Sequence, residues 1–113
     1  MPTAGNVTEL ETEEEFDDFI KNPELYTFID FYTTWCGPCK RVVPIIGELA
    51  KEYNAKMLFG RLDLDKIRAV QARYRIANVP TFIIFLKGQK ISSFIGAQPK
   101  NKFIEEIEKV LKE

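Results

Sequence analysis

The segment "FIDFYTTWCGPCK", residues 28–40, contains both cysteines of the chain, Cys36 and Cys39. The residues "YTFIDFY" (26–32) are aromatic or β-branched on both alternating faces, which is typical of a central strand buried in a sheet. After the cysteines, apolar residues recur at helical spacing from Val42 to Tyr53. The sequence therefore places the two cysteines where a buried strand passes into a helix.

Strands and helices are expected to alternate along the rest of the chain. Further strands are predicted at 7–10, 56–65, 81–85 and 90–95, and further helices after Thr12, at 67–75 and after Pro99. Pro44 should kink the helix that follows the cysteines. This order indicates an α/β fold with helices on both faces of a mixed sheet. Its first part should pair in parallel through helical crossovers, and the hairpin at 81–95 should add an antiparallel edge.

Length and composition limit the classes of function. The 113 residues fit one domain, 1–113, and 45% hydrophobic with 29% charged residues is typical of a soluble globular protein. The net charge of -1 includes no basic block, so we do not expect nucleic acid as a partner. The chain has no histidine, the commonest general base and metal ligand in proteins.

The sequence also bears on location. No stretch approaches the ~18 apolar residues of a membrane span, so we expect no membrane partner. The N-terminal segment lacks a basic region followed by an apolar run, and we do not interpret it as a secretory signal. We expect a cytoplasmic protein, in a compartment that keeps thiols reduced.

The spacing of the cysteines predicts reactive sulfurs. Residues three apart share a helix face, so the sulfurs of Cys36 and Cys39 can meet. The first N–H groups of a helix favour an anion, so the pKa of Cys36 should lie below that of a free cysteine. Pro38 loses no hydrogen bond in the first turn. Gly37 keeps bulk away from an approaching substrate, and Trp35 adds an apolar surface beside the site.

From the residues alone, three other readings of the pair are open. Two unreactive core cysteines fit poorly with a Gly-Pro helix start. A zinc or iron–sulfur site needs four ligands, which two cysteines without histidine supply only if two chains share the ion. A structural disulfide would close too small a loop to constrain the unfolded chain much.

Three segments together resemble the thioredoxin family over essentially the whole chain: the one quoted above, "NVPTFIIFLKGQ" (78–89) and "FIGAQPK" (94–100). The resemblance implies the thioredoxin fold, a central five-stranded mixed β-sheet flanked by four α-helices. It implies a monomeric protein-disulfide reductase without cofactor or metal. Its partners would be disulfide-containing target proteins and a thioredoxin reductase or equivalent electron donor.

The resemblance also implies roles for single residues. Cys36 would be the nucleophile and Cys39 the resolving cysteine, with Asp30 buried beneath them and exchanging a proton with Cys39. From the residues alone, the alternative interpretation of Asp30 is a solvent-facing residue at a strand end. Arg61 stands where many members have lysine. It cannot donate a proton, but its charge would lower the pKa of Asp30 if it faced inward; a solvated edge arginine is the alternative.

Target binding is the last expectation drawn from the resemblance. The Val79–Pro80 bond would be cis and would face the cysteines, leaving the backbone of Val79 free to pair with an extended substrate. An apolar collar would surround the sulfurs, formed by Trp35, Gly37, Pro38, Pro80, Gly96 and Ala97. Tyr32 replaces a tryptophan found in many members, so packing there should differ.

Two competing functions use the same fold. Oxidase and isomerase domains commonly carry histidine between the cysteines, which makes the disulfide more oxidising. Pro38 occupies that position here, which favours a reductase. A non-redox binding subunit would use the collar as a docking face, and its activity would survive replacement of both cysteines by serine.

Overall fold

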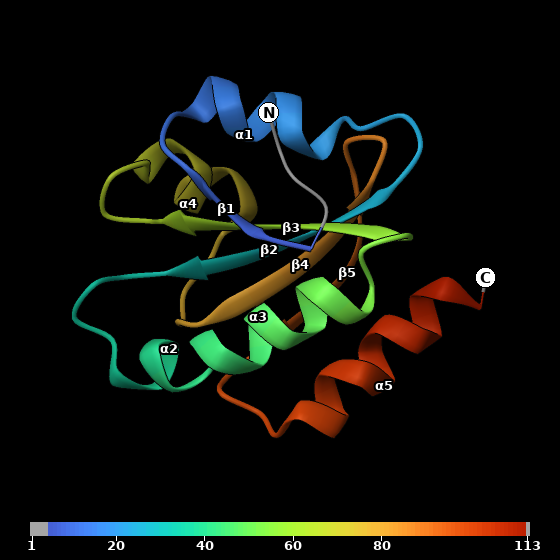
Figure 1. Cartoon of the computed structure of the whole chain (residues 1–113). Coiled ribbons are helices and arrows are strands. Elements are labelled where there is room, and N and C mark those ends of the chain that lie inside the picture. Colours follow the sequence, from blue (N-terminus) through green and yellow to red (C-terminus); the bar gives the residue numbers. More distant parts are fainter. Residues whose placement is uncertain (1–4, 113) are drawn as a thin grey trace.

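The computed structural model describes residues 5–112. Residues 1–4, which carry part of the expectation about a secretory signal, and residue 113 lie outside the described residues. The elements, drawn in Figure 1, are β1 (Val7–Leu10), α1 (Glu13–Ile20), β2 (Tyr26–Tyr32), α2 (Gly37–Arg41), α3 (Val43–Glu52), β3 (Met57–Asp63), α4 (Arg68–Tyr74), β4 (Thr81–Leu86), β5 (Gln89–Ile95) and α5 (Lys100–Leu111).

The strands form one five-stranded mixed sheet in the order β1-β3-β2-β4-β5, which confirms the predicted sheet. β1 and β2 pair with β3 in parallel, as expected for strands joined by helical crossovers. β4 runs antiparallel to β2, and β5 runs antiparallel to β4. The antiparallel part therefore begins one strand further inside the sheet than the sequence predicted.

Helices cover both faces of the sheet. Figure 1 shows α1 and α4 on one side and α2, α3 and α5 on the other. Within residues 5–112 there are five helices, so the expected number of four is wrong. The segment after the cysteines is divided at Val42, because Pro44 has no N–H and its ring excludes the carbonyl group four residues before it. A second helix, α3, therefore begins at Val43, where the sequence predicts only a kink in one helix.

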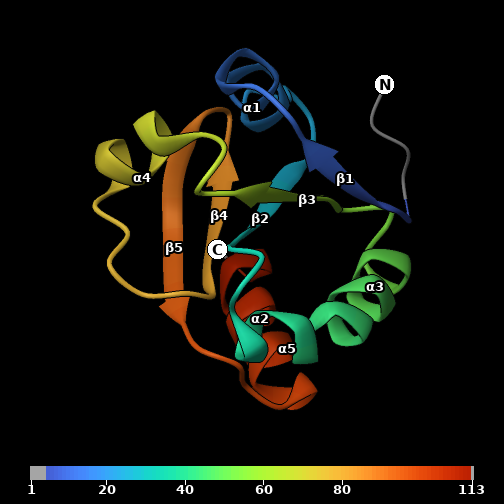
Figure 2. The same ribbon diagram turned by 90° about the vertical axis from the view of Figure 1, so that its left-hand side faces the viewer.

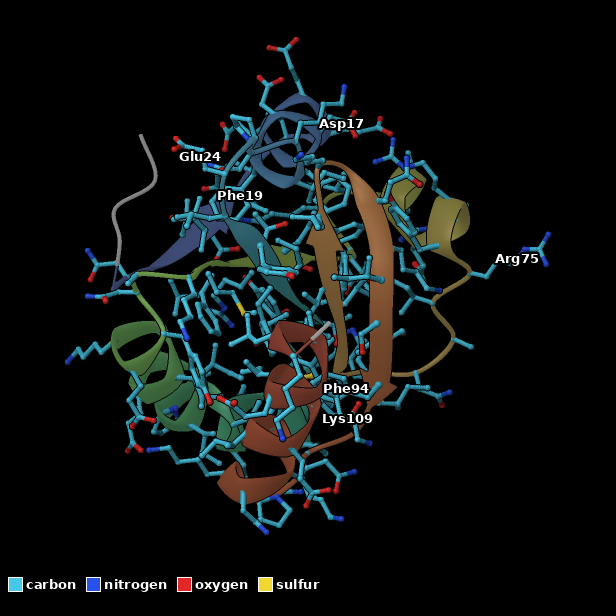
Figure 3. The ribbon with its side chains drawn as sticks, turned by 90° about the vertical axis from the view of Figure 1, so that its right-hand side faces the viewer. Asp17, Phe19, Glu24, Arg75, Phe94 and Lys109 are labelled. Atoms are coloured by element: carbon cyan, nitrogen blue, oxygen red, sulfur yellow. A yellow bond between two sulfur atoms is a disulfide. The ribbon has the colours of Figure 1, made fainter. Side chains whose placement is uncertain are left out.

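Each face of the sheet has its own apolar core. The first packs α1 and α4 against the sheet, with Phe16, Ile29 and Phe31 fully buried. Phe19 of α1 faces the sheet in Figure 3 and lies so close to Gly60 that a Cβ built there would be 3.0 Å from its ring. By contrast, Arg75, just after α4, projects away from the body.

The second core lies between the sheet and helices α3 and α5. Phe28 of β2 contacts four other aromatic rings there, at centroid distances of 4.8–6.4 Å: Phe59, Phe82, Phe94 and Phe103. Phe94, labelled in Figure 3, comes from β5. Because side chains alternate along a strand, Asp30 points to the same face as Phe28. Asp30, the predicted proton carrier, therefore lies on the face of the sheet that carries the second core.

In the part of the chain that the structure describes, no helix has the length and apolar character needed to cross a membrane.

Candidate active site

Cys36 and Cys39 lie at the carboxyl end of β2, the end that faces the viewer in Figure 2. Cys36 is the N-cap of α2, and its Sγ accepts a hydrogen bond from the backbone N–H of Cys39 at 3.1 Å. The two residues form a disulfide, with their Cα atoms 5.3 Å apart. Their exposed fractions are 4% and 2%, so in this oxidised state Cys36 is hardly more accessible than Cys39.

The loop that carries the cysteines is held by the neighbouring strand. The backbone carbonyl of Tyr32 accepts a hydrogen bond from Leu64 N–H at 2.9 Å, just beyond β3. Trp35 is 71% exposed, and its Nε1–H donates to Asp65 Oδ2 at 3.0 Å. The indole therefore offers an open apolar face while its polar edge is fixed. The sequence analysis did not identify Asp65. The signal that could have identified it is an acidic residue directly after β3, since β3 ends beside β2.

A second loop meets the cysteines from the side of β4. The Val79–Pro80 peptide bond is cis, as the resemblance implied. Val79 packs against the cluster formed by the two cysteines and Tyr32. The carbonyl of Pro80 accepts a hydrogen bond from the N–H of Gly96 at 2.9 Å. This bond joins the proline loop to the third segment of the predicted collar.

The other collar residues differ in exposure. Pro38 is half-buried on α2, whereas Gly37 and Ala97 are exposed. Gly96 has φ of +97°, a left-handed conformation that glycine adopts without strain. The structure thus brings the three predicted segments to one end of the sheet. Whether targets bind to them stays a prediction.

Asp30 is buried in the face of the sheet that carries α3. Its exposed fraction is 1%, which rules out the solvent-facing alternative. Burial raises the pKa of Asp30 to about 7; the positive charge of Arg61 lowers it and the negative charge of Glu9 raises it. Its carboxylate atom Oδ1 has no hydrogen-bond partner among residues 5–112. Asp30 lines a cavity of about 40 Å³ together with Val7, Val43, Ile46 and Arg61.

Arg61 is half-buried, and its surroundings differ from both alternatives drawn from the sequence. Its Nη1 forms an ion pair with Glu9 Oε1 at 3.4 Å, and its guanidinium carbon lies 3.8 Å from the centroid of the Tyr32 ring. The Tyr32 hydroxyl donates a hydrogen bond to Glu9 Oε2 at 2.6 Å. Arg61 also borders a surface hollow that Cys39 and Lys40 line. The sequence analysis did not identify Glu9. The signal that could have identified it is its position in β1, the strand that pairs with β3.

The arrangement supplies two sulfurs that can exchange two electrons, and one buried carboxyl that can exchange a proton near neutral pH. Among the described residues, no group of three or more histidine, cysteine, aspartate or glutamate side chains is placed to hold a metal ion.

Comparisons with known proteins agree with this geometry. The family model described as Thioredoxin matches residues 7–109. Thioredoxin from Staphylococcus saprophyticus is 38% identical over 100 residues, covering 88% of this chain and 94% of its own length. The M-type chloroplastic thioredoxin of Spinacia oleracea is 39% identical over 94 residues, or 83% of this chain.

The chain spans 52% of the length of the spinach protein. It also matches the chloroplastic thioredoxin Y of Oryza sativa, of which it spans 60% of the length. Among solved structures, Plasmodium falciparum thioredoxin superposes with a TM-score of 0.84 at 33% identity. That match covers 91% of this chain and 98% of the other.

Proposed function

The chain belongs to the thioredoxin family of thiol–disulfide oxidoreductases, and from this premise we propose that it is a small dithiol electron carrier that reduces disulfides in target proteins. The observation that carries the proposal is the Cys36–Cys39 pair at the start of α2, where Cys36 Sγ accepts a backbone N–H. Such a hydrogen bond favours the thiolate, the reactive form of the thiol. Pro38, in place of a histidine, supports a reductase over an oxidase or isomerase.

The reaction moves two electrons to the target in two exchanges. The Cys36 thiolate attacks one sulfur of a target disulfide, so the target bond breaks, a mixed disulfide forms and one target thiolate leaves. Cys39, once deprotonated, attacks Cys36 Sγ, which releases the second target thiolate and closes the Cys36–Cys39 disulfide. The target is reduced and the carrier is oxidised by the same two electrons. An electron donor, thioredoxin reductase or an equivalent, then returns the pair to the dithiol.

Asp30 would take the proton from Cys39 in the second exchange. A carboxyl whose pKa is raised to about 7 suits this role, because it is partly ionised at neutral pH and can both accept and release a proton. The cavity of about 40 Å³ beside Asp30 exceeds the ~10–15 Å³ that one water needs. A water there would give the buried carboxylate a hydrogen-bond partner.

Targets would bind across the three segments around the sulfurs. The exposed face of Trp35 supplies apolar contact area, and its bond to Asp65 limits the entropy lost when the ring is fixed. The backbone of Val79 would pair with an extended stretch of the target, and Gly37, Pro38, Pro80, Gly96 and Ala97 would complete the surface.

We place the protein in the cytoplasm as a monomer, and its partners are the target disulfides and the donor reductase. A dithiol carrier needs a compartment that keeps its thiols reduced. The relatives include chloroplastic proteins and a protein of Staphylococcus saprophyticus. Cell fractionation and size-exclusion chromatography with light scattering would test both statements.

The function is tested by reduction of insulin with dithiothreitol as the electron source. The protein should accelerate the loss of insulin disulfides catalytically, and Cys36→Ser should abolish the acceleration. A redox titration against glutathione should then show a pair more reducing than glutathione. A pair more oxidising than glutathione would support the oxidase or isomerase reading, and an inactive protein would support the binding subunit.

A further inference from the structure

A row of charged side chains crosses the sheet below the cysteines. Glu9 of β1, Arg61 of β3 and Asp30 of β2 are direct neighbours in the parallel register, so their side chains point to the same face. Arg61 stands between the two carboxylates. It can pair closely with one of them, and the choice decides whether Asp30 has a cationic partner.

The structure shows which carboxylate Arg61 pairs with. Its Nη1 lies 3.4 Å from Glu9 Oε1, and its guanidinium group stacks over the Tyr32 ring. Glu9 is fixed in turn, because its Oε2 accepts the hydrogen bond of the Tyr32 hydroxyl. Among residues 5–112, no ion pair within 4.0 Å joins Arg61 to Asp30, and neither Arg61 Nε nor Asp30 Oδ1 has a hydrogen-bond partner.

We propose that Glu9 is a positioning residue for the Cys39 step: together with Tyr32 it holds Arg61 away from Asp30, so that no guanidinium group pairs with the carboxylate that accepts the proton. This inference rests on the proposed reductase function. Glu9 would act through its contacts with Arg61 and Tyr32 and not by touching the target. Tyr32 itself packs against the two cysteines.

The charges around Asp30 explain why this placement matters. An arginine in direct contact lowers the pKa of a carboxyl by about 1–3 units. A carboxylate whose pKa lies far below neutral pH is a weak base and accepts the proton of a thiol poorly. Glu9 opposes this shift in two ways, by binding Arg61 and by its own negative charge. Burial and the bond to Glu9 raise the pKa of Tyr32, so its hydroxyl stays a donor.

No other packed element supplies a competing charge at the Asp30 cavity among the described residues. α3 contributes Val43 and Ile46, and β1 contributes Val7. The opposing residue in β4 is Phe82. On the side of the cysteines, Cys39 and Lys40 line the hollow that Arg61 also borders. The arrangement of Glu9 and Arg61 can therefore raise or lower the pKa of Asp30.

The test is Glu9→Gln, which keeps the length and an acceptor for Tyr32 but removes the charge that holds Arg61. The pKa of Asp30 is measured by carboxyl carbon NMR in the oxidised protein, where the cysteines do not titrate. We expect it to fall by about one pH unit. The pH midpoint for resolution of a mixed disulfide by Cys39 should fall with it. Glu11→Gln is the matched control, because Glu11 pairs at the surface with Lys66 and should leave both midpoints unchanged.

An Arg61→Gln background separates positioning from simple repulsion. In that background Glu9→Gln should lower the pKa of Asp30 by less than half of the shift seen with Arg61 present, because no guanidinium group remains to be released. An Asp30 midpoint that is unchanged in Glu9→Gln, or a shift equally large without Arg61, would overturn the inference. If the NMR shift occurs in a protein that reduces no disulfide, the proposed function fails and the control of Asp30 by Glu9 stands.

Discussion

Replacement of Asp30 by asparagine should stabilise the protein, and the gain should depend on pH. The carboxyl is 1% exposed and its pKa is raised from 3.8 to about 7, chiefly by burial. Between these values the folded protein holds a proton that the unfolded chain has released. Stability is therefore fully present below pH 3.8, is lost as the pH rises toward 7, and levels off above that.

The magnitude follows from the same two values. Each pH unit between 3.8 and about 7 corresponds to about 1.4 kcal/mol, so ionised Asp30 should destabilise the folded state by roughly 4 kcal/mol above neutral pH. Asp30→Asn removes this loss. Any difference in packing between the amide and the acid is independent of pH, so the change between two pH values isolates the charge.

Urea unfolding of the oxidised protein at pH 3.5 and pH 8 provides the measurement. The unfolding free energy of Asp30→Asn minus that of the unsubstituted protein should rise by roughly 4 kcal/mol between the two pH values. Asp18→Asn makes the same chemical change at an exposed residue of α1, and its difference should stay nearly constant. A difference for Asp30→Asn that is equally flat, or that falls as the pH rises, would refute the argument.

Two further predictions concern the sheet and the order of attack. Gly60→Ala should lower the unfolding free energy by about 1–3 kcal/mol, because the new Cβ would meet Phe19 at 3.0 Å and Leu10 at 3.2 Å. Gly47→Ala, with nothing within 4 Å, should raise it by about 0.5–1 kcal/mol, and equal effects of the two in urea unfolding would contradict the packing described. Cys39→Ser should accumulate mixed disulfides with targets on non-reducing gels, whereas Cys36→Ser should not; the opposite pattern would reverse the two roles.

Much of the fold follows from local patterns. Thr12 was predicted to open the first helix, and its Oγ1 accepts the N–H of Glu15 at 3.0 Å. The aromatic strand before the cysteines is buried along almost its whole length. The five-stranded mixed sheet and membership of the thioredoxin family are confirmed. These features depend on neighbouring residues, which the sequence displays directly.

The features that the sequence did not predict depend on distant contacts. The antiparallel direction of β4 against β2 is decided by how the chain returns after α4, and periodicity carries no such information. The ion pair between Glu9 and Arg61 requires the register of β1 on β3. The bond from Trp35 to Asp65 likewise joins two loops 30 residues apart. Residue types alone left Arg61 with two orientations, and its pairing with Glu9, a residue far away in the sequence, gives it a third.

In the proposed reaction Cys36 and Cys39 pass two electrons to a protein disulfide, and a single turnover measures this transfer. The reduced protein, freed of dithiothreitol, is mixed with excess insulin. The insulin thiols and the redox state of the two cysteines are then counted by alkylation and mass spectrometry. We predict one insulin disulfide reduced for each chain oxidised, with the oxidised chain carrying the Cys36–Cys39 disulfide. Insulin left intact beside a reduced Cys36 and Cys39 would show that the pair does not reduce protein disulfides.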